Sequence, residues 1–373
     1  MHLRALRALA GCYAARLGVA SQPGLVGPIR VGSPPVRQQL LLFEIGTTTG
    51  VFVRFAAKHN IARDSPAECN PFAVFPDRRP CRLGEGDAVA LVAPASWADS
   101  AWIEQTAGVL AGWGWEVRVG RHAHDRLGYL AGTDDDRLAD LNAAIRDPRV
   151  RAIVCVTGGC GSFRLVRGVD VEALRADPKP IVGYSDITAL HRVWQAVGVP
   201  SLHGAGAGAH AETVRKLLIG ARPDPVVADP NRYGAMLTTT GAATGVLAGG
   251  NLELLARNVG VVEFDLEGCV LLLEANRAAG LGMVDRALTQ LIDSGSLAGI
   301  SGVAIGILEG FEGYEDRDWD VVDVLRERLG LLKVPILAGL PVGHDPNPVT
   351  VPLGVACVLD ADAGTLACGP AMR

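Results

Sequence analysis

From Arg82 onward, short apolar runs alternate with segments of helical periodicity, and this alternation is the feature that most restricts the fold. The apolar runs are only a few residues long and end at glycine, proline or polar residues, which is typical of buried strands. Strands that alternate with helices in this way predict an α/β fold with a parallel, doubly wound sheet. In chain order we expect a strand at 88–94, a helix at 102–113, a strand at 116–119, a helix at 134–146, a strand at 153–156, a helix at 171–176 and a strand at 180–183.

The pattern also divides the chain. Prolines interrupt residues 211–241, so we expect a linker at 211–244 between a first α/β domain at 81–210 and a smaller second domain at 245–373. Residues 1–80 contain no Asp or Glu before Glu44 and show no sustained period. We expect them to be a disordered or spurious leader. Arg7 and Arg16 interrupt the first apolar stretch, which makes a secretory signal a poor fit.

The composition excludes several classes of function. Hydrophobic residues make up 49% and charged residues 20%, and the net charge of −5 gives no electrostatic case for nucleic acid or for an anionic membrane surface. No apolar run approaches the roughly 20 residues that span a bilayer. The eight cysteines form no Cys-x-x-Cys pair, so we expect reduced, mostly buried thiols, no metal site and a reducing, cytoplasmic compartment.

The segment 153–165 concentrates the features of a functional turn. A β-branched run stops at Gly158-Gly159, and Cys160-Gly161-Ser162 follow before another helical segment. A tight glycine turn between a strand and a helix can present a nucleophilic serine beside backbone N–H groups that stabilise an oxyanion. A phosphate-binding or purely structural loop is the alternative. The spacing matches neither Gly-x-Gly-x-x-Gly, nor a Walker loop, nor Gly-x-Ser-x-Gly.

Further polar side chains fall at the predicted carboxyl ends of strands, where ligands bind in such sheets. They are Ser96, Ser162, Tyr184-Ser185-Asp186, His203, Glu274 and His344. Ser185 and Asp186 also suit a helix cap, and His203 suits either a base or a histidine bonded to backbone. Glu274 ends an apolar strand, where a carboxylate needs a partner or a function. Ser162, Glu274 and His344 together supply the residue types of a catalytic triad.

From about Arg82 to the C-terminus the sequence resembles the LD-carboxypeptidase family of serine peptidases, which includes the microcin C immunity proteins. Motifs in the same order carry the resemblance: 84–87 with 89–96, 135–137 with 140–142, 158–162, 183–188, 249–252, 273–274, 285–291 and 339–344.

The resemblance implies a Rossmann-like (flavodoxin-like) N-terminal domain and a C-terminal domain with a swivelling-type β core. It implies Ser162 as nucleophile, His344 as general base and then acid, and Glu274 as the group that orients the histidine. Gly159 and Phe163 would supply oxyanion donors, with Ser96 and Asp186 beside the substrate. The reaction would release the terminal D-alanine of a murein tetrapeptide in cell-wall recycling, in a homodimer that needs no metal or organic cofactor.

Some residues depart from the family pattern and affect the substrate pocket. Cys160 replaces the residue between the glycines, residues 276–280 replace acidic and aromatic residues after the glutamate, and residues 203–205 lack the usual proline. Arg164 could bind the substrate carboxylate, stay exposed or pair with Asp186.

Three other functions stay open at this point, one of them an interaction protein that would use the basic leader at residues 1–80. Another is an immunity-type peptidase that cleaves aminoacyl nucleotides, for which Trp97, Trp102, Tyr314 or Trp319 could stack the base, although packing in the core is the commoner role of such residues. The third is a non-catalytic module that binds a phosphorylated ligand at the turn 158–162.

Overall fold

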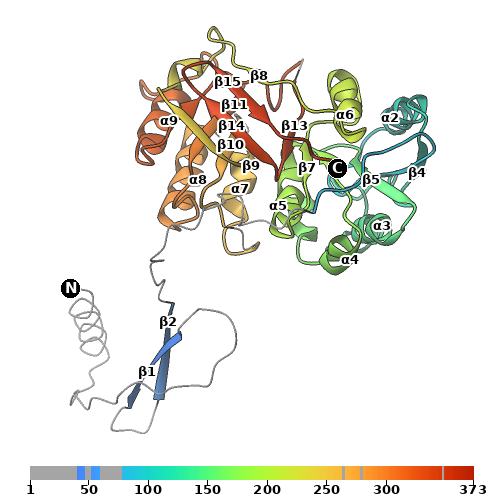
Figure 1. Cartoon of the computed structure of the whole chain (residues 1–373), viewed down its shortest axis with the longest axis horizontal. Coiled ribbons are helices and arrows are strands. Elements are labelled where there is room, and N and C mark those ends of the chain that lie inside the picture. The colour runs from blue at the N-terminus through green and yellow to red at the C-terminus, as the bar shows by residue number, and fades with distance from the viewer. Residues whose placement is uncertain (1–39, 47–51, 59–77, 263–264, 278–279, 347) are drawn as a thin grey trace. The chain divides into compact units, whose positions relative to one another are not determined.

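The computed structural model describes residues 40–46, 52–58, 78–262, 265–277, 280–346 and 348–373 (Figure 1). The first described strands, β1 (Leu40–Gly46) and β2 (Phe52–Lys58), pair antiparallel within a unit of residues 1–69, which is separate from the unit of residues 70–373. They fall in the segment that we expected to be a leader without structure. The rest of that leader prediction falls outside the described residues.

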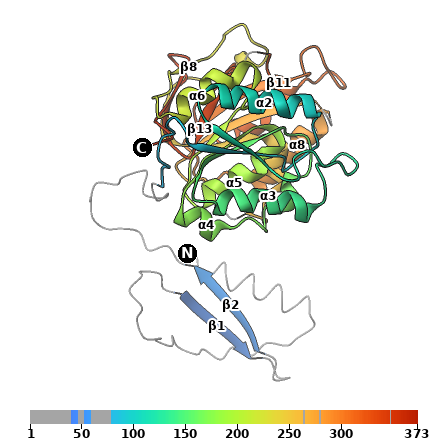
Figure 2. The ribbon, with the colours of Figure 1, turned by 90° about the vertical axis from the view of Figure 1, so that its right-hand side faces the viewer.

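The first half of the large unit forms a six-stranded sheet in the order β13-β7-β6-β5-β3-β4. Its strands are parallel except β13, which runs antiparallel to β7. Figure 2 shows α2 and α6 over one face of this sheet and α3, α4 and α5 over the other. These elements are β3 (Ala88–Val92), α2 (Ser100–Gly112), β4 (Glu116–Val119), α3 (Asp134–Arg146), β5 (Val150–Cys155), α4 (Val171–Ala176), β6 (Ile181–Gly183), α5 (Thr188–Ala196), β7 (Ser201–His203), α6 (Ala211–Leu218) and β13 (Val351–Leu353).

The second half forms a seven-stranded sheet in the order β12-β11-β10-β9-β14-β15-β8. The strands from β9 to β12 are parallel to one another, whereas β14, β15 and β8 add antiparallel pairs at one side. The elements are β8 (Val226–Val227), β9 (Ala242–Asn251), α7 (Leu252–Arg257), β10 (Val270–Asn276), α8 (Leu281–Asp293), β11 (Gly302–Glu309), α9 (Val321–Gly330), β12 (Ile336–Leu337), β14 (Ala356–Asp360) and β15 (Thr365–Cys368).

The expected α/β class is therefore confirmed. The Rossmann-like and swivelling-type descriptions of the two sheets stay predictions, and so do the domain boundaries. The segment 211–244, which we expected to be a linker, contains the helix α6 and the strand β8. Prolines in this segment interrupt the pattern, but α6 lies before them and buries Val214, Leu217 and Leu218.

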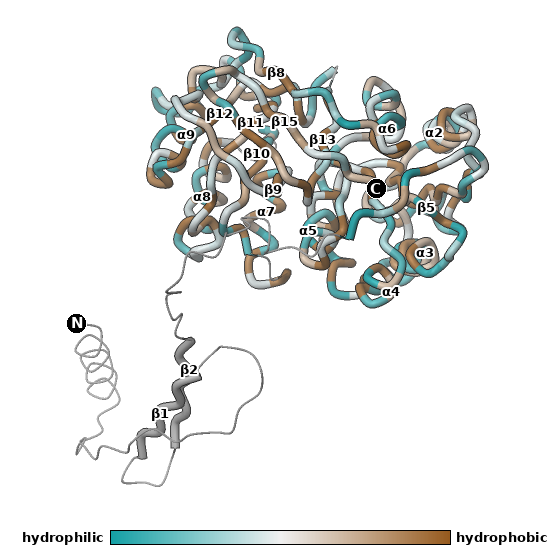
Figure 3. Tube along the Cα trace, in the orientation of Figure 1, coloured by the Kyte–Doolittle hydropathy of each residue, from teal (hydrophilic) through white to brown (hydrophobic). Residues whose placement is uncertain are grey.

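A shared apolar core joins the two sheets. One cluster of buried residues contains Leu91 and Val154 of the first sheet together with Leu272 of the second. Leu353 on β13 belongs to the same cluster, so the second half contributes a strand both to the pairing and to the core of the first. Figure 3 shows apolar colouring concentrated along the central strands. The two halves consequently form one packed body, with separate outer clusters beneath α3 to α5 and beneath α7 to α9.

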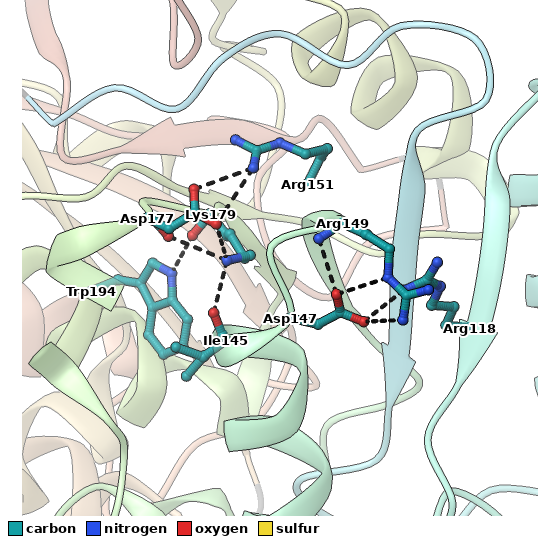
Figure 4. Close-up of polar contacts among 8 residues, drawn as sticks. All are labelled: Arg118, Ile145, Asp147, Arg149, Arg151, Asp177, Lys179 and Trp194. Carbon is teal, nitrogen blue, oxygen red and sulfur yellow. Dashed lines mark hydrogen bonds and ion pairs between the residues drawn. The ribbon is translucent and has the colours of Figure 1, made fainter. Parts of the chain in front are cut away.

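Polar groups secure the end of α3 at the amino edge of the first sheet (Figure 4). The fully buried Lys179 Nζ donates to the carbonyl of Ile145 at 2.7 Å and to Asp177 Oδ2 at 2.6 Å. Trp194 Nε1 on α5 donates to the carbonyl of Lys179 at 2.8 Å. The last carbonyls of a helix lack partners within the helix, so Lys179 satisfies one of them and ties α3 to the start of β6.

Among the described residues, no helix has both the length and the apolar character that crossing a membrane requires. The six described cysteines are unpaired, and four of them are buried: Cys155, Cys269, Cys357 and Cys368. Cys12 and Cys69 lie outside the described residues, and the expected cytoplasmic location stays a prediction.

Candidate active site

The turn after β6 holds a serine in a strained conformation. Ser185 follows Gly183-Tyr184 and has φ +59°, in the left-handed region that few non-glycine residues adopt. A helix begins directly after it, with a 3₁₀ turn at Ser185–Ile187 and then α5. Ser185 is half-buried, and its hydroxyl makes no hydrogen bond within the described part of the chain. A sharp strand-to-helix turn that leaves a serine hydroxyl unengaged has the geometry of a nucleophile elbow.

Ser162, which we predicted as the nucleophile, lies at a different kind of position. Its side chain is fully buried, and its hydroxyl donates to the carbonyl of Asp186 at 2.6 Å. Its backbone N–H donates to Asp186 Oδ2 at 2.8 Å. The sequence led us to expect an exposed serine side chain on this turn, but that of Ser162 is buried. Ser162 links the glycine loop to the turn that carries Ser185.

The glycine loop 158–161 packs directly against the Ser185 turn. A Cβ added to Gly158 would lie 3.0 Å from the Cβ of Ser185 and 3.4 Å from the backbone nitrogen of Asp186. Ser96, in the loop after β3, accepts the N–H of Cys160 at 3.0 Å, and a Cβ on Gly159 would lie 2.4 Å from the Ser96 Oγ. Ser96 therefore holds the loop in place, and a residue without a side chain at Gly158 lets the loop approach Ser185, as one at Gly159 lets it approach Ser96.

Asp186 is the buried anchor of this arrangement, and burial raises the pKa of its carboxyl, against the lowering effect of the hydrogen bond from Ser162. Beneath the loop, the buried Arg137 donates to the carbonyl of Pro94 and pairs with Asp134. Arg164 pairs with Asp134 at 2.8 Å, so of its expected roles the salt bridge to Asp186 is wrong. Phe163 is half-buried against the core beneath α3 to α5.

Glu274, near the end of β10, meets His344, which lies in the segment between β12 and β13. His344 Nδ1 lies 2.8 Å from Glu274 Oε2, and since a carboxylate only accepts, the histidine donates from Nδ1 and leaves Nε2 for other chemistry. Glu274 is fully buried. Burial has the largest single effect on the pKa of His344 and lowers it, but the hydrogen bond and charge of Glu274, with the charge of Glu309, outweigh it and raise the pKa.

Gly343 makes the contact between these two residues possible. It has φ +112°, and a Cβ at this position would lie 3.0 Å from the Glu274 Cβ and 3.2 Å from its Oε2. A glycine is therefore required for the chain to pass this close to the glutamate and present the histidine ring to it.

Tyr184 connects the two halves of the site. Its ring centroid lies 5.1 Å from that of His344, and it directly precedes Ser185 in the chain. The start of α5 also touches the end of β9, because Thr188 Oγ1 accepts the N–H of Asn251 at 3.0 Å. Asn251 is in register with Glu274 on the neighbouring strand. The turn with Ser185 and the pair Glu274–His344 therefore share one region between the two sheets.

Two further histidines, His203 and His210, lie near the ring of Tyr184. Its ring centroid is 6.3 Å from that of His203 and 5.5 Å from that of His210. His203 is buried, and within the described residues neither of its ring nitrogens has a hydrogen-bond partner, so backbone does not satisfy it. Burial, with the neighbouring histidines, lowers the pKa of His203 well below its usual value and keeps the ring neutral.

One group of side chains has the geometry to hold a metal ion. His122, Asp125 and Asp136 each offer a ligand atom, and these atoms lie within 4.8 Å of one another. Hydrogen bonds also account for the arrangement, because His122 Nδ1 contacts Asp125 Oδ2 at 2.7 Å and Asp136 accepts from Thr133 at the start of α3. His122, Asp125 and Asp136 lie in segments of the chain that contribute neither the turn of Ser185 nor the pair Glu274–His344.

Comparison with known proteins identifies the family. The LD-carboxypeptidase N-terminal domain matches residues 89–204, and the LD-carboxypeptidase C-terminal domain matches residues 244–359. The chain belongs to the LD-carboxypeptidase family. This membership makes the chain a hydrolase of the carboxypeptidase class.

Individual members of the LD-carboxypeptidase family are similar over most of their length. A Streptomyces coelicolor protein that bears a carboxypeptidase name is 40% identical over 303 residues, which cover 77% of this chain and 95% of that protein. The murein tetrapeptide carboxypeptidase of Pseudomonas aeruginosa is 29% identical over 294 residues, 74% of this chain and 93% of that protein. The structure of wild-type microcin C7 self-immunity protein, 21% identical, covers 78% of this chain and 98% of its own with a TM-score of 0.67, which supports the fold.

Proposed function

We propose that this protein is a serine-type LD-carboxypeptidase that releases the terminal D-alanine of a murein tetrapeptide through a Ser-His-Glu triad. The observation that carries the proposal is the hydrogen bond of 2.8 Å between His344 Nδ1 and the buried Glu274, which orients a histidine base beside the turn of Ser185. The murein tetrapeptide carboxypeptidase among its relatives supports the substrate class.

Within this proposal we assign the nucleophile to Ser185 in place of Ser162. The hydroxyl of Ser162 is buried and donates to a backbone carbonyl, whereas that of Ser185 is unengaged on a strained turn. The family resemblance assigned the role to Ser162, the serine after the glycines, but in this proposal the geometry favours Ser185, against which Gly158 packs. Ser162 and Asp186 would then position the loop.

The reaction follows from these positions. Ser185 Oγ attacks the carbonyl carbon of the scissile amide while His344 Nε2 takes the hydroxyl proton. The backbone N–H groups of Gly159 and Asp186 would stabilise the oxyanion, with Asp186 taking the role that we expected of Phe163. His344 then protonates the departing amine of D-alanine. Water, deprotonated by His344, attacks the acyl-enzyme and releases the shortened peptide. We propose that this chemistry needs no metal or organic cofactor. We also propose that the protein is a cytoplasmic homodimer.

The test compares the wild type with Ser185→Ala and Ser162→Ala on L-Ala-D-Glu-meso-diaminopimelate-D-Ala, with product masses as the readout. We expect the wild type to release one D-alanine. Ser185→Ala should lose on the order of a millionfold in rate, as triad serines do. Ser162→Ala should keep measurable turnover. As a control, the melting temperatures of both variants are compared with that of the wild type, so that a loss of activity is not mistaken for a loss of folding. Inactivity of Ser162→Ala alone would return the nucleophile to Ser162, and an inactive wild type would refute the substrate.

An immunity-type peptidase that cleaves aminoacyl nucleotides is the second candidate, supported by the fold shared with the microcin C7 self-immunity protein. Two of the aromatic residues considered for base stacking are already engaged. Trp97 lies under Arg126 at 4.0 Å and donates to the carbonyl of Gly128, and Trp102 donates to the carbonyl of Val156. An aminoacyl-sulfamoyl adenylate offered to the same variants would reveal this activity.

A further inference from the structure

The helix α5 donates two side-chain hydrogen bonds to backbone carbonyls at opposite ends of the strand β6. Trp194 Nε1 donates to the carbonyl of Lys179, which lies before the strand, at 2.8 Å (Figure 4). His191 Nε2 donates to the carbonyl of Gly183, the last residue of the strand, at 2.8 Å. Gly183 lies two residues before Ser185, so the second bond is made at the entrance to the strained turn and the first at the other end of the strand.

The ring of His191 is held in one protonation state. The side chain is fully buried, and burial lowers the pKa of His191 to about 4, so the ring is neutral near pH 7. Because a carbonyl only accepts, Nε2 carries the proton and Nδ1 does not. Within the described residues Nδ1 has no hydrogen-bond partner, and a buried polar atom without a partner lowers stability. Stability alone therefore gives little reason for a histidine here, and what this side chain adds is its bond to Gly183.

The turn of Ser185 is held from both sides. A non-glycine residue stays in the left-handed region only where its surroundings restrain it. After Ser185, Ser162 bonds the carbonyl of Asp186 at 2.6 Å and its carboxylate at 2.8 Å. Before Ser185, the bond from His191 fixes the carbonyl of Gly183. His191 therefore supplies a side-chain restraint on the incoming strand, as Ser162 does on the outgoing turn.

The helix that carries His191 is itself tied to the second sheet. Thr188 Oγ1, at the start of α5, accepts the N–H of Asn251 at 3.0 Å, and Asn251 is in register with Glu274 on β10. The bond from His191 thus joins the turn of Ser185 to a helix whose start contacts the strand next to Glu274. This places the proposed nucleophile in a defined relation to the Glu274 carboxylate that orients the base, and the rate of attack depends on such geometry.

We propose that His191 is a positioning residue for the nucleophile, and that its hydrogen bond to the carbonyl of Gly183 holds the Ser185 hydroxyl where His344 can take its proton. This inference rests on the proposed function, with Ser185 as the nucleophile. In this role His191 exchanges no proton with the substrate and acts only through the turn. Its loss should therefore lower kcat and leave KM almost unchanged.

The test compares variants of His191 with the wild type on the murein tetrapeptide, at a temperature well below the melting temperature of each protein. His191→Leu fills a similar volume without a donor, whereas His191→Gln carries an amide N–H at about the reach of Nε2. His191→Leu should lower kcat by about 10- to 100-fold with KM within about twofold of the wild type. His191→Gln should bring kcat back to within about fivefold of the wild type. His191→Met, which also lacks a donor but adapts to irregular spaces, repeats the comparison if the leucine variant does not fold.

Trp194→Phe is the matched control. It removes a ring N–H bond of the same length, made by the same buried helix, at the other end of β6. It should lower the melting temperature at least as much as His191→Leu does, since the carbonyl of Gly183 also accepts the N–H of Gly204 at 3.0 Å and keeps that bond when His191 is replaced. Its kcat should equal that of the wild type, because the bond it removes is not at the turn of Ser185.

The outcomes separate positioning from a contact that only stabilises the fold. A loss of kcat that His191→Gln reverses and that Trp194→Phe does not share would support the proposal. Equal kcat values in His191→Leu and Trp194→Phe, or a loss that falls on KM alone, would overturn it and leave the proposed activity intact. A wild type that releases no D-alanine would overturn the proposed function and this inference with it.

Discussion

Gly343→Ala should lower both the turnover at the proposed active site and the stability of the fold, and the two losses can be measured separately. The backbone at Gly343 has φ +112°, and holding an L-residue in such a conformation costs on the order of 1–3 kcal/mol. The new Cβ would lie 3.0, 3.1 and 3.2 Å from the Cβ, Cγ and Oε2 of Glu274. These contacts are too close by a few tenths of an ångström, and the fully buried Glu274 has little room to move. The pair Glu274–His344 must therefore shift.

A misplacement on the scale of 1 Å can cost about 100-fold in rate. We therefore expect Gly343→Ala to lower kcat/KM by about 10- to 100-fold on the murein tetrapeptide and to lower the unfolding free energy by about 1–3 kcal/mol in chemical denaturation. The matched control is Gly364→Ala, which has φ +68° and no atom within 4 Å of its added Cβ. It should lose about 1 kcal/mol of stability and no turnover. Wild-type kcat/KM in a folded Gly343→Ala protein would refute the reasoning.

Two further predictions test separate parts of the structure. Glu274→Gln removes a charge that raises the pKa of His344, so the acidic limb of the pH profile of kcat/KM should move to lower pH. The plateau of kcat/KM should fall by about 100- to 10,000-fold. An acidic limb that does not move, measured between pH 4 and 8, would contradict the pairing of Glu274 with His344. Lys179→Met leaves the carbonyl of Ile145 without its donor, so the unfolding free energy should fall by about 1–3 kcal/mol. We expect kcat/KM to stay unchanged, because Lys179 precedes β6 whereas Ser185 follows it. A stability equal to that of the wild type would show that this contact contributes nothing.

The parallel strands were predictable because each is a short, nearly continuous apolar run. Leu271, Leu272 and Leu273 on β10, for example, are buried on both faces of their sheet, and such runs leave few alternatives. Glu274 and His344 were predictable as a pair through the family resemblance of residues 273–274 and 339–344, while the residues alone indicated only that a carboxylate after an apolar strand needs a partner or a function. The strand β13 was not predictable, since it is three residues long and pairs with a strand about 150 residues earlier in the chain.

The two serines show where sequence reasoning reached its limit. Three glycines around Cys160 marked a place where backbone comes close to something, but they did not say to what. In the structure Gly158 makes room for the turn of Ser185, whereas Gly159 lies against Ser96 and Gly161 against Leu130 and Arg137. A signal was present in the sequence: Tyr184-Ser185-Asp186 stands between a buried strand and a helix, which is the context of a nucleophile elbow. A capping role for Ser185 explained the same residues, and its positive φ is the observation on which we base the proposal that Ser185 is the nucleophile.

The pairing of β13 with β7 has a consequence for how the enzyme can be divided. A cut in the segment between the two family domains would leave Val351–Leu353 on the fragment that carries Glu274 and His344, while its partner strand stays on the fragment that carries Ser185. Each fragment would expose one edge of that pairing and one side of the shared apolar core. Co-expressed halves should therefore recognise each other and restore a split site, whereas either half alone would present an open strand edge and aggregate.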